Sequence, residues 1–141
     1  MSARHDLVLV DTSVAVASIV EDHPAHGVAS AALDGCIAGL AGHAWFETFS
    51  VLTRLPGDSR RAPSEVADVL LQNFPETRWL PDSDAARLSL RLSELGIAGG
   101  SVYDALVAMT AVVHDLVLVT RDRRALPTYA ALGARVEVLS D

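Results

Sequence analysis

Four acidic residues occupy positions from which their side chains can combine to do chemistry: Asp11, Glu47, Asp104 and Asp122. Asp11 ends the short apolar run L-V-L-V-D at 7–11, and Asp122 lies two residues beyond a near repeat, L-V-L-V-T, at 116–120. Such runs are typical of strands buried on both faces of a parallel sheet. Because ligands bind outside the carboxyl ends of parallel strands, we expect Asp11 and Asp122 to share that edge.

The other two acids stand near the beginnings of helices. Glu47 falls in the first turn of an amphipathic helix expected over 44–55, which Pro56 and Gly57 end. Asp104 lies near the start of the most apolar helix, expected over 102–113, and heads a stripe of small apolar residues. A carboxylate at the head of such a stripe faces inward, where an ionised group is costly unless it is paired or bound to a metal.

Four carboxylates at one edge repel one another, and a pair about 4 Å apart costs roughly 1 to 4 kcal/mol. A hard divalent cation such as Mg²⁺ or Mn²⁺ removes this repulsion and prefers oxygen ligands. One or two such ions suit phosphodiester hydrolysis, which then needs no serine, cysteine or histidine nucleophile. We therefore predict that the four acids are both metal ligands and catalytic residues.

Two other interpretations of the acids stay open. Loops that lead from a strand to a helix supply helix caps, so Asp11 and Asp122 could each cap a helix, and Ser101 with Asp104 has the spacing of a capping box. Alternatively, the chain could be a non-catalytic binding module whose acidic pocket docks a basic segment of a partner. Cleavage activity in the presence of Mn²⁺ separates the enzyme from the binding module.

The elements that must position these acids alternate between strand and helix along the whole chain. This alternation predicts right-handed crossovers and a parallel sheet with helices on both faces, in a single domain over residues 1–141. The expected strands are 7–11, 36–40, 77–80, 116–120 and 136–139. The expected helices are 12–20, 24–33, 44–55, 64–74, 82–95, 102–113 and 126–132.

The composition excludes several classes of protein. All 11 basic residues are arginine, so phosphotransferases and P-loop proteins that depend on a lysine do not fit. The turn after the first strand lacks the glycines of a dinucleotide-binding fold. The single cysteine, Cys36, allows no internal disulfide. With neither a signal peptide nor an apolar stretch long enough to span a membrane, we expect a cytoplasmic protein.

Four ordered motifs surround the acids: V-D-T-S at 10–13, H-A-W-F-E at 43–47, G-G-S-V-Y-D-A-L-V-A at 99–108 and L-V-L-V-T-R-D at 116–122. With these motifs in this order, the chain resembles the PIN-domain family, and within it the VapC-type toxins of toxin–antitoxin pairs. The resemblance covers essentially the whole chain, and the third and fourth motifs are its most specific part.

The resemblance implies a three-layer α/β/α sandwich around a five-stranded parallel sheet, and endoribonuclease activity that depends on Mg²⁺ or Mn²⁺. It maps the family's four acids, in order, onto Asp11, Glu47, Asp104 and Asp122, with Thr12 or Ser13 as the hydroxyl residue that supports the first. It also implies an RNA substrate, a homodimer, and a cognate antitoxin that covers the acidic pocket.

The charged and aromatic residues around the acids suggest further roles. The net charge of −7 is unusual for a protein that binds nucleic acid, and favours capture by a basic antitoxin segment whose arginine enters the acid cluster. Arginines 121, 123 and 124 either contact RNA phosphates or are solvated helix ends, and both interpretations stay open. Trp45, Phe46 and Phe49 are expected in the core or a dimer interface rather than as surfaces for base stacking.

Overall fold

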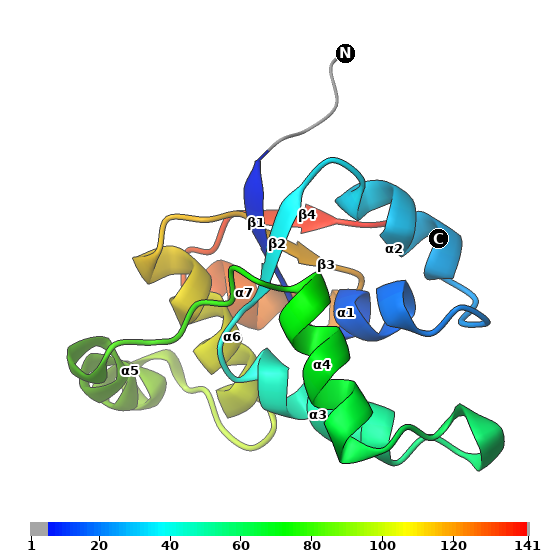
Figure 1. Cartoon of the computed structure of the whole chain (residues 1–141). Helices are drawn as coiled ribbons and strands as arrows, with labels where there is room; N and C mark the ends of the chain where they lie inside the picture. Colours follow the sequence, from blue (N-terminus) through cyan, green and yellow to red (C-terminus); the bar gives the residue numbers. More distant parts are fainter. Residues whose placement is uncertain (1–5, 141) are drawn as a thin grey trace.

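The computed structural model describes residues 6–140, whose centre is a four-stranded sheet with all strands parallel (Figure 1). The strand order is β2-β1-β3-β4. β1 (Leu7–Val10) pairs with β2 (Ile37–Leu40) on one side and with β3 (Leu118–Thr120) on the other, and β4 (Val136–Val138) completes the sheet beside β3. Strand order therefore reverses at β1, whose carboxyl end is the point where parallel sheets bind ligands.

Seven α-helices and two short 3₁₀ helices connect these strands in the described chain. The α-helices are α1 (Thr12–Ile19), α2 (His26–Leu33), α3 (Ala44–Thr53), α4 (Pro63–Asn73), α5 (Asp82–Leu95), α6 (Ser101–Val113) and α7 (Leu126–Ala131). The 3₁₀ helices are η1 (Gly57–Ser59) and η2 (Arg123–Ala125).

The helices form the two outer layers of the predicted α/β/α sandwich. The crossover from β1 to β2 runs in the opposite direction from that between β2 and β3, so right-handed connections place their helices on opposite faces. Accordingly α1 packs against α2, whereas α6 packs against α7 and α5 (Figure 1). The predicted fold class is confirmed.

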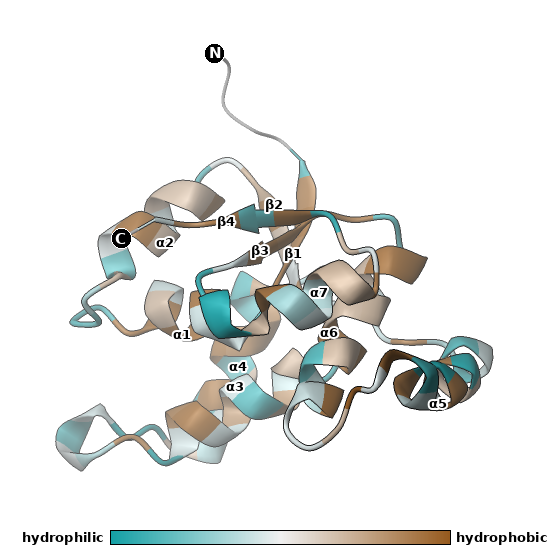
Figure 2. Cartoon of the chain, turned by 180° about the vertical axis from the view of Figure 1, so that it is seen from behind, coloured by the Kyte–Doolittle hydropathy of each residue, from teal (hydrophilic) through white to brown (hydrophobic). Residues whose placement is uncertain are grey.

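The core is built from the apolar strands and the helix faces that cover them. Val8, Leu9 and Val10 of β1 are fully buried, as expected for a central parallel strand covered on both faces. Figure 2 shows hydrophobic residues concentrated on the strands, whereas α5 carries hydrophilic and hydrophobic residues side by side. In α5 only Leu88 is buried. None of the described helices is both long and apolar enough to cross a membrane.

The prediction of a fifth strand over 77–80 is wrong. This segment runs beside β2 but forms only one parallel bridge, between Ala41 and Arg78. The N–H of Leu40 donates to the side-chain hydroxyl of Thr77 (3.0 Å) instead of to a backbone carbonyl, which interrupts the ladder. The backbone also comes so close that a Cβ at Gly39 would lie 2.0 Å from the carbonyl oxygen of Glu76.

Candidate functional site

Asp11 lies at the carboxyl end of β1, where it is almost fully buried. Its backbone is extended and its side chain caps α1, because Oδ1 accepts from the N–H of Val14 (3.3 Å). Oδ1 also accepts from the Ser13 hydroxyl (2.6 Å), and Oδ2 accepts from the hydroxyls of Thr120 and Tyr129, the latter at 2.8 Å. The carboxylate therefore joins β1, α1, β3 and α7.

Burial and hydrogen bonding act in opposite directions on Asp11. Burial raises the pKa of its carboxyl group, while the donors from Ser13, Thr120, Tyr129 and Val14 lower it. The pKa of Tyr129 is also raised, by its own burial and then by the negative charge of Asp11, so the phenol stays protonated and donates. Four donors fill the acceptor positions of this carboxylate.

The predicted supporting hydroxyl is Ser13 rather than Thr12. Ser13 donates to Asp11 and accepts from the N–H of Arg121 (3.0 Å), which ties the loop after β3 to α1. Thr12 instead donates to the carbonyl of Ala44 (3.4 Å) and accepts from the buried hydroxyl of Thr48 (3.4 Å), so it holds α3 against α1.

Glu47 lies in the first turn of α3, half-buried and electrostatically coupled to the other acids. Burial is the main cause that raises the pKa of its carboxyl group, and His43 opposes this shift. The negative charges of Asp104 and Asp11 raise it further, and Arg124 lowers it. Residues of α6 and η2, and residues next to β1 and α3, thus act on a single carboxyl group.

Asp104 and Asp122 are held together by one arginine. Arg124 donates from Nη1 to Oδ2 of Asp104 (3.2 Å) and from Nη2 to Oδ2 of Asp122 (3.0 Å). Asp122 also caps η2 by accepting from the backbone N–H of Arg124 (3.1 Å). The two carboxylates raise the pKa of the Arg124 guanidinium, which is itself largely exposed.

The helix-cap interpretation holds for two of the acids only. Asp11 and Asp122 are side-chain caps. Asp104 is not, because α6 is preceded by Gly100 without a side-chain cap, so the capping-box interpretation of Ser101 with Asp104 is wrong. Only 14% of the Asp104 side chain is exposed, in agreement with the inward orientation expected from its stripe.

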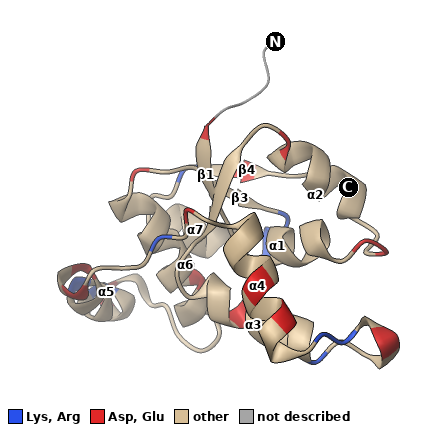
Figure 3. Cartoon of the chain, in the orientation of Figure 1, with Lys and Arg blue, Asp and Glu red and all other residues tan. Residues whose placement is uncertain are grey.

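The acids meet at one edge but do not form a finished metal site. Within residues 6–140, no three acid, histidine or cysteine side chains lie close enough to hold one ion. Arg124 occupies the space between Asp104 and Asp122, and four donors surround Asp11. Negative charge is not confined to this edge, since acids also lie along α4 and α5 (Figure 3).

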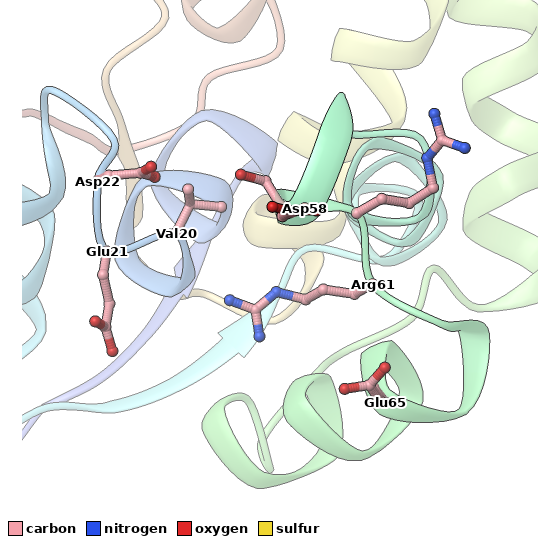
Figure 4. A pocket seen from close by; sticks show the side chains of 8 residues that line it. Val20, Glu21, Asp22, Asp58, Arg61 and Glu65 are labelled. Carbon is pink, nitrogen blue, oxygen red and sulfur yellow. The ribbon is translucent and has the colours of Figure 1, made fainter.

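Two cavities bear on where a ligand could bind. A groove of about 290 Å³ runs along α3 and includes Thr12, His43, Phe46, Glu47 and Arg54 in its lining. A larger cavity of about 540 Å³ lies between the end of α1 and η1, where Arg61 extends among Asp22, Asp58 and Glu65 (Figure 4). It contains none of the four predicted acids, so we assign no chemistry to it.

Comparisons with known proteins point to one family. The model of the PIN domain matches residues 8–132. Ribonuclease VapC27 of Mycobacterium tuberculosis is 45% identical over 92% of this chain and 94% of its own length, and ribonuclease VapC40 of the same species is 39% identical over 95% of this chain and 100% of its own. The chain belongs to the PIN-domain family, among its VapC ribonucleases.

Solved structures share the PIN fold at lower sequence identity. VapBC2 from Rickettsia felis, bound to a DNA fragment from its promoter, matches with a TM-score of 0.66 at 15% identity. The aligned region covers 95% of this chain and 99% of the chain in that structure. FitAB bound to the IR36 DNA fragment has a TM-score of 0.68 at 18% identity, over 93% of this chain and 94% of its own. The four-stranded sheet and its helices are thus the PIN architecture.

Tyr129, Thr120 and Arg124 have roles in the site that sequence reasoning missed. A tyrosine in a short C-terminal helix is expected in the core, and Tyr129 is indeed buried. Its hydroxyl donates a hydrogen bond to Asp11, which the sequence does not reveal. From the sequence, Arg124 is expected, like Arg121 and Arg123, either to contact RNA or to be a solvated helix end. A basic residue two positions after an acid at a strand end is the only signal in the sequence for this pairing.

Proposed function

We propose that this PIN domain is a metal-dependent endoribonuclease that uses Asp11, Glu47, Asp104 and Asp122 to hold Mg²⁺ or Mn²⁺. The observation that carries the proposal is that carboxylates from four separate segments converge on one edge, where the exposed Arg124 pairs with two of them. VapC relatives named as ribonucleases, at 39–45% identity, support RNA as the substrate.

The donor set fits a hard divalent cation. All four side chains supply carboxylate oxygens, which Mg²⁺ and Mn²⁺ prefer. Asp104 and Asp122 become available when Arg124 turns away, which costs little because 68% of its side chain is exposed. At Asp11, Ser13 is the donor best able to give way, since its hydroxyl keeps a hydrogen bond from Arg121.

Hydrolysis joins a water oxygen to phosphorus and breaks the bond between phosphorus and the leaving ribose oxygen. When bound, a divalent ion lowers the pKa of the attacking water and stabilises the leaving oxygen. Glu47, half-buried beside Asp104 and Asp11 but outside the ion pairs of Arg124, is the acid we assign to take the proton of that water. Arg124, released from its two carboxylates, is placed to contact a phosphate oxygen.

We further propose that the partner is an antitoxin with a basic segment, and that the domain forms a homodimer. The pairing of Arg124 with Asp104 and Asp122 supports the first point, because a guanidinium from another chain would find the same two carboxylates. Relatives of known structure are named as VapBC and FitAB assemblies. A cytoplasmic location stays a prediction.

Cleavage of RNA by the partner-free protein tests the proposal. Purified full-length chain is incubated with a mixture of unstructured and folded RNAs in Mn²⁺, and in parallel with an excess of EDTA. We expect endonucleolytic fragments with Mn²⁺ and none with EDTA. If no RNA of any kind is cut in Mn²⁺, the domain is a binding module. Equal cleavage in EDTA would refute the metal site.

A further inference from the structure

Exposed aromatic side chains lie on the two helices that carry Glu47 and Asp104 and on the segment before α5. Phe46, Trp79 and Tyr103 are each about half exposed, at 59%, 48% and 50%. Phe46 precedes Glu47 and Tyr103 precedes Asp104, so two of the three are chain neighbours of predicted catalytic acids. The rings of Phe46 and Trp79 are 5.5 Å apart. Large apolar rings left in water next to a polar site need an explanation beyond folding.

The clearest pair consists of His43 and Tyr103. Their rings stack with centroids 4.9 Å apart and planes 15° apart, although one comes from the start of α3 and the other from the first turn of α6. Within the described chain, no hydrogen bond is recorded for either side chain. The half-exposed Tyr103 therefore offers a flat aromatic surface in a fixed orientation, beside the first turns that carry Glu47 and Asp104.

This pair adjoins the groove along α3, to which His43 itself contributes. His43, Phe46, Glu47 and Ser50 follow the spacing of one helix face, and Arg54 lies at the far end. The groove thus presents, in order, aromatic rings, a catalytic acid, a hydroxyl and a guanidinium. Its volume of about 290 Å³ suits a ligand part about the size of one nucleotide rather than a duplex.

We propose that this groove holds one unpaired nucleotide next to the scissile phosphate, with its base stacked on the His43–Tyr103 pair and the following phosphate on Arg54. The inference rests on the proposed ribonuclease function and adds the side chains that position the substrate beside the acids. Sequence-tolerant recognition of single strands combines aromatic stacking with cationic contacts to the backbone.

Binding of a short unstructured oligoribonucleotide, measured by fluorescence anisotropy in EDTA, tests the proposal without cleavage. We expect His43→Ala and Tyr103→Ala each to weaken binding about 5- to 100-fold, the loss of roughly one stacked base. His43→Phe and Tyr103→Phe keep a flat ring and should bind within about twofold of the unchanged protein. A duplex of the same composition should bind weakly and be insensitive to these substitutions.

The matched control is Ile37→Ala. Ile37 is also about half exposed, but it begins β2 and so lies at the opposite edge of the sheet. The Ile37→Ala substitution should therefore leave RNA binding unchanged. Unchanged binding by Tyr103→Ala, or equal loss in Tyr103→Ala and Tyr103→Phe, would overturn the stacking role. A change in oligomeric state by sedimentation without a change in RNA binding would assign the rings to a protein interface instead.

Failure of this inference is distinguishable from failure of the proposed function. Should the unchanged protein cut RNA in Mn²⁺ while Tyr103→Ala binds and cuts equally well, the groove assignment falls and the nuclease stands. Should the unchanged protein cut nothing, yet bind single strands through Tyr103, the groove stands and the nuclease falls. In an active enzyme, the alanine variants should raise KM more than they lower kcat, because the rings bind the substrate outside the reacting atoms.

Discussion

Replacing Tyr129 by phenylalanine tests whether Asp11 is held as a buried carboxylate. The substitution removes a hydroxyl that donates to Oδ2 of Asp11 at 2.8 Å, and both side chains are nearly inaccessible to water. A hydrogen bond to a charged group contributes about 1.5–3 kcal/mol, and its buried acceptor loses one of four donors. We expect the free energy of unfolding in metal-free buffer to fall by about this amount.

The expected fall converts into a measurable change in melting temperature. Unfolding entropies of about 2.1 cal/mol/K per residue imply, for a chain of this length, a shift of roughly 3 °C per kcal/mol. Tyr129→Phe should therefore lower Tm by about 5–10 °C, and urea unfolding followed by circular dichroism should give the same loss in free energy. An unchanged midpoint would refute the hydrogen bond and the charge that it stabilises.

A double-mutant cycle isolates the role of the charge. In the Asp11→Asn background the acceptor is neutral, so Tyr129→Phe should cost only about 0.5–1.5 kcal/mol. The coupling between the two substitutions then measures the part of the interaction that depends on ionised Asp11. Equal costs in both backgrounds would mean that Tyr129 acts through packing alone, and the reasoning about the carboxylate would be wrong.

Three further predictions follow from the same structure. Gly39→Ala should destabilise the fold by about 1–3 kcal/mol or more, because its Cβ would lie 2.0 Å from the backbone of Glu76. In the control Gly27→Ala the Cβ meets nothing within 4 Å, so this variant should be neutral or slightly stabilising. Urea unfolding of both variants measures the difference. Arg124→Gln should bind Mn²⁺ more tightly in a calorimetric titration, because the cation no longer competes with a resident guanidinium, and unchanged affinity would contradict the shared site. Millimolar Mg²⁺ should raise the Tm of the unchanged protein in a thermal scan by relieving carboxylate repulsion, and no shift would count against the metal site.

Most of the fold could be predicted because local signals and packing agree along the chain. The apolar run of β1, the alternation of strand and helix, and Gly96, which ends α5 with a positive φ, are each visible in sequence. The segment around Thr77 has the composition of a strand, but its pairing depends on the hydroxyl that accepts from Leu40. Whether a side chain takes the place of a backbone hydrogen-bond partner depends on the tertiary structure, and the periodicity of the sequence does not reveal it.

The site could be predicted in its acids but not in the groups that surround them. Asp104 was recognisable because a carboxylate at the head of an apolar stripe must be compensated. Its partner Arg124 comes from 20 positions further along the chain, and the donor from Tyr129 to Asp11 spans 118. Such long-range pairs have no local signature. The stack of His43 on Tyr103 likewise arises only when α3 and α6 meet.

The most direct test of the central claim is cleavage of RNA in Mn²⁺ by Asp104→Asn, compared with Asp84→Asn. Asp84 is a closely matched control, because it too lies in the first turn of a helix, pairs with an arginine and is similarly shielded (13% exposed against 14%), but it belongs to α5. If the carboxylates form the nuclease site, Asp104→Asn abolishes cleavage with an unchanged unfolding curve, and Asp84→Asn cuts normally. Full activity of Asp104→Asn, or loss of activity only together with unfolding, would contradict the claim.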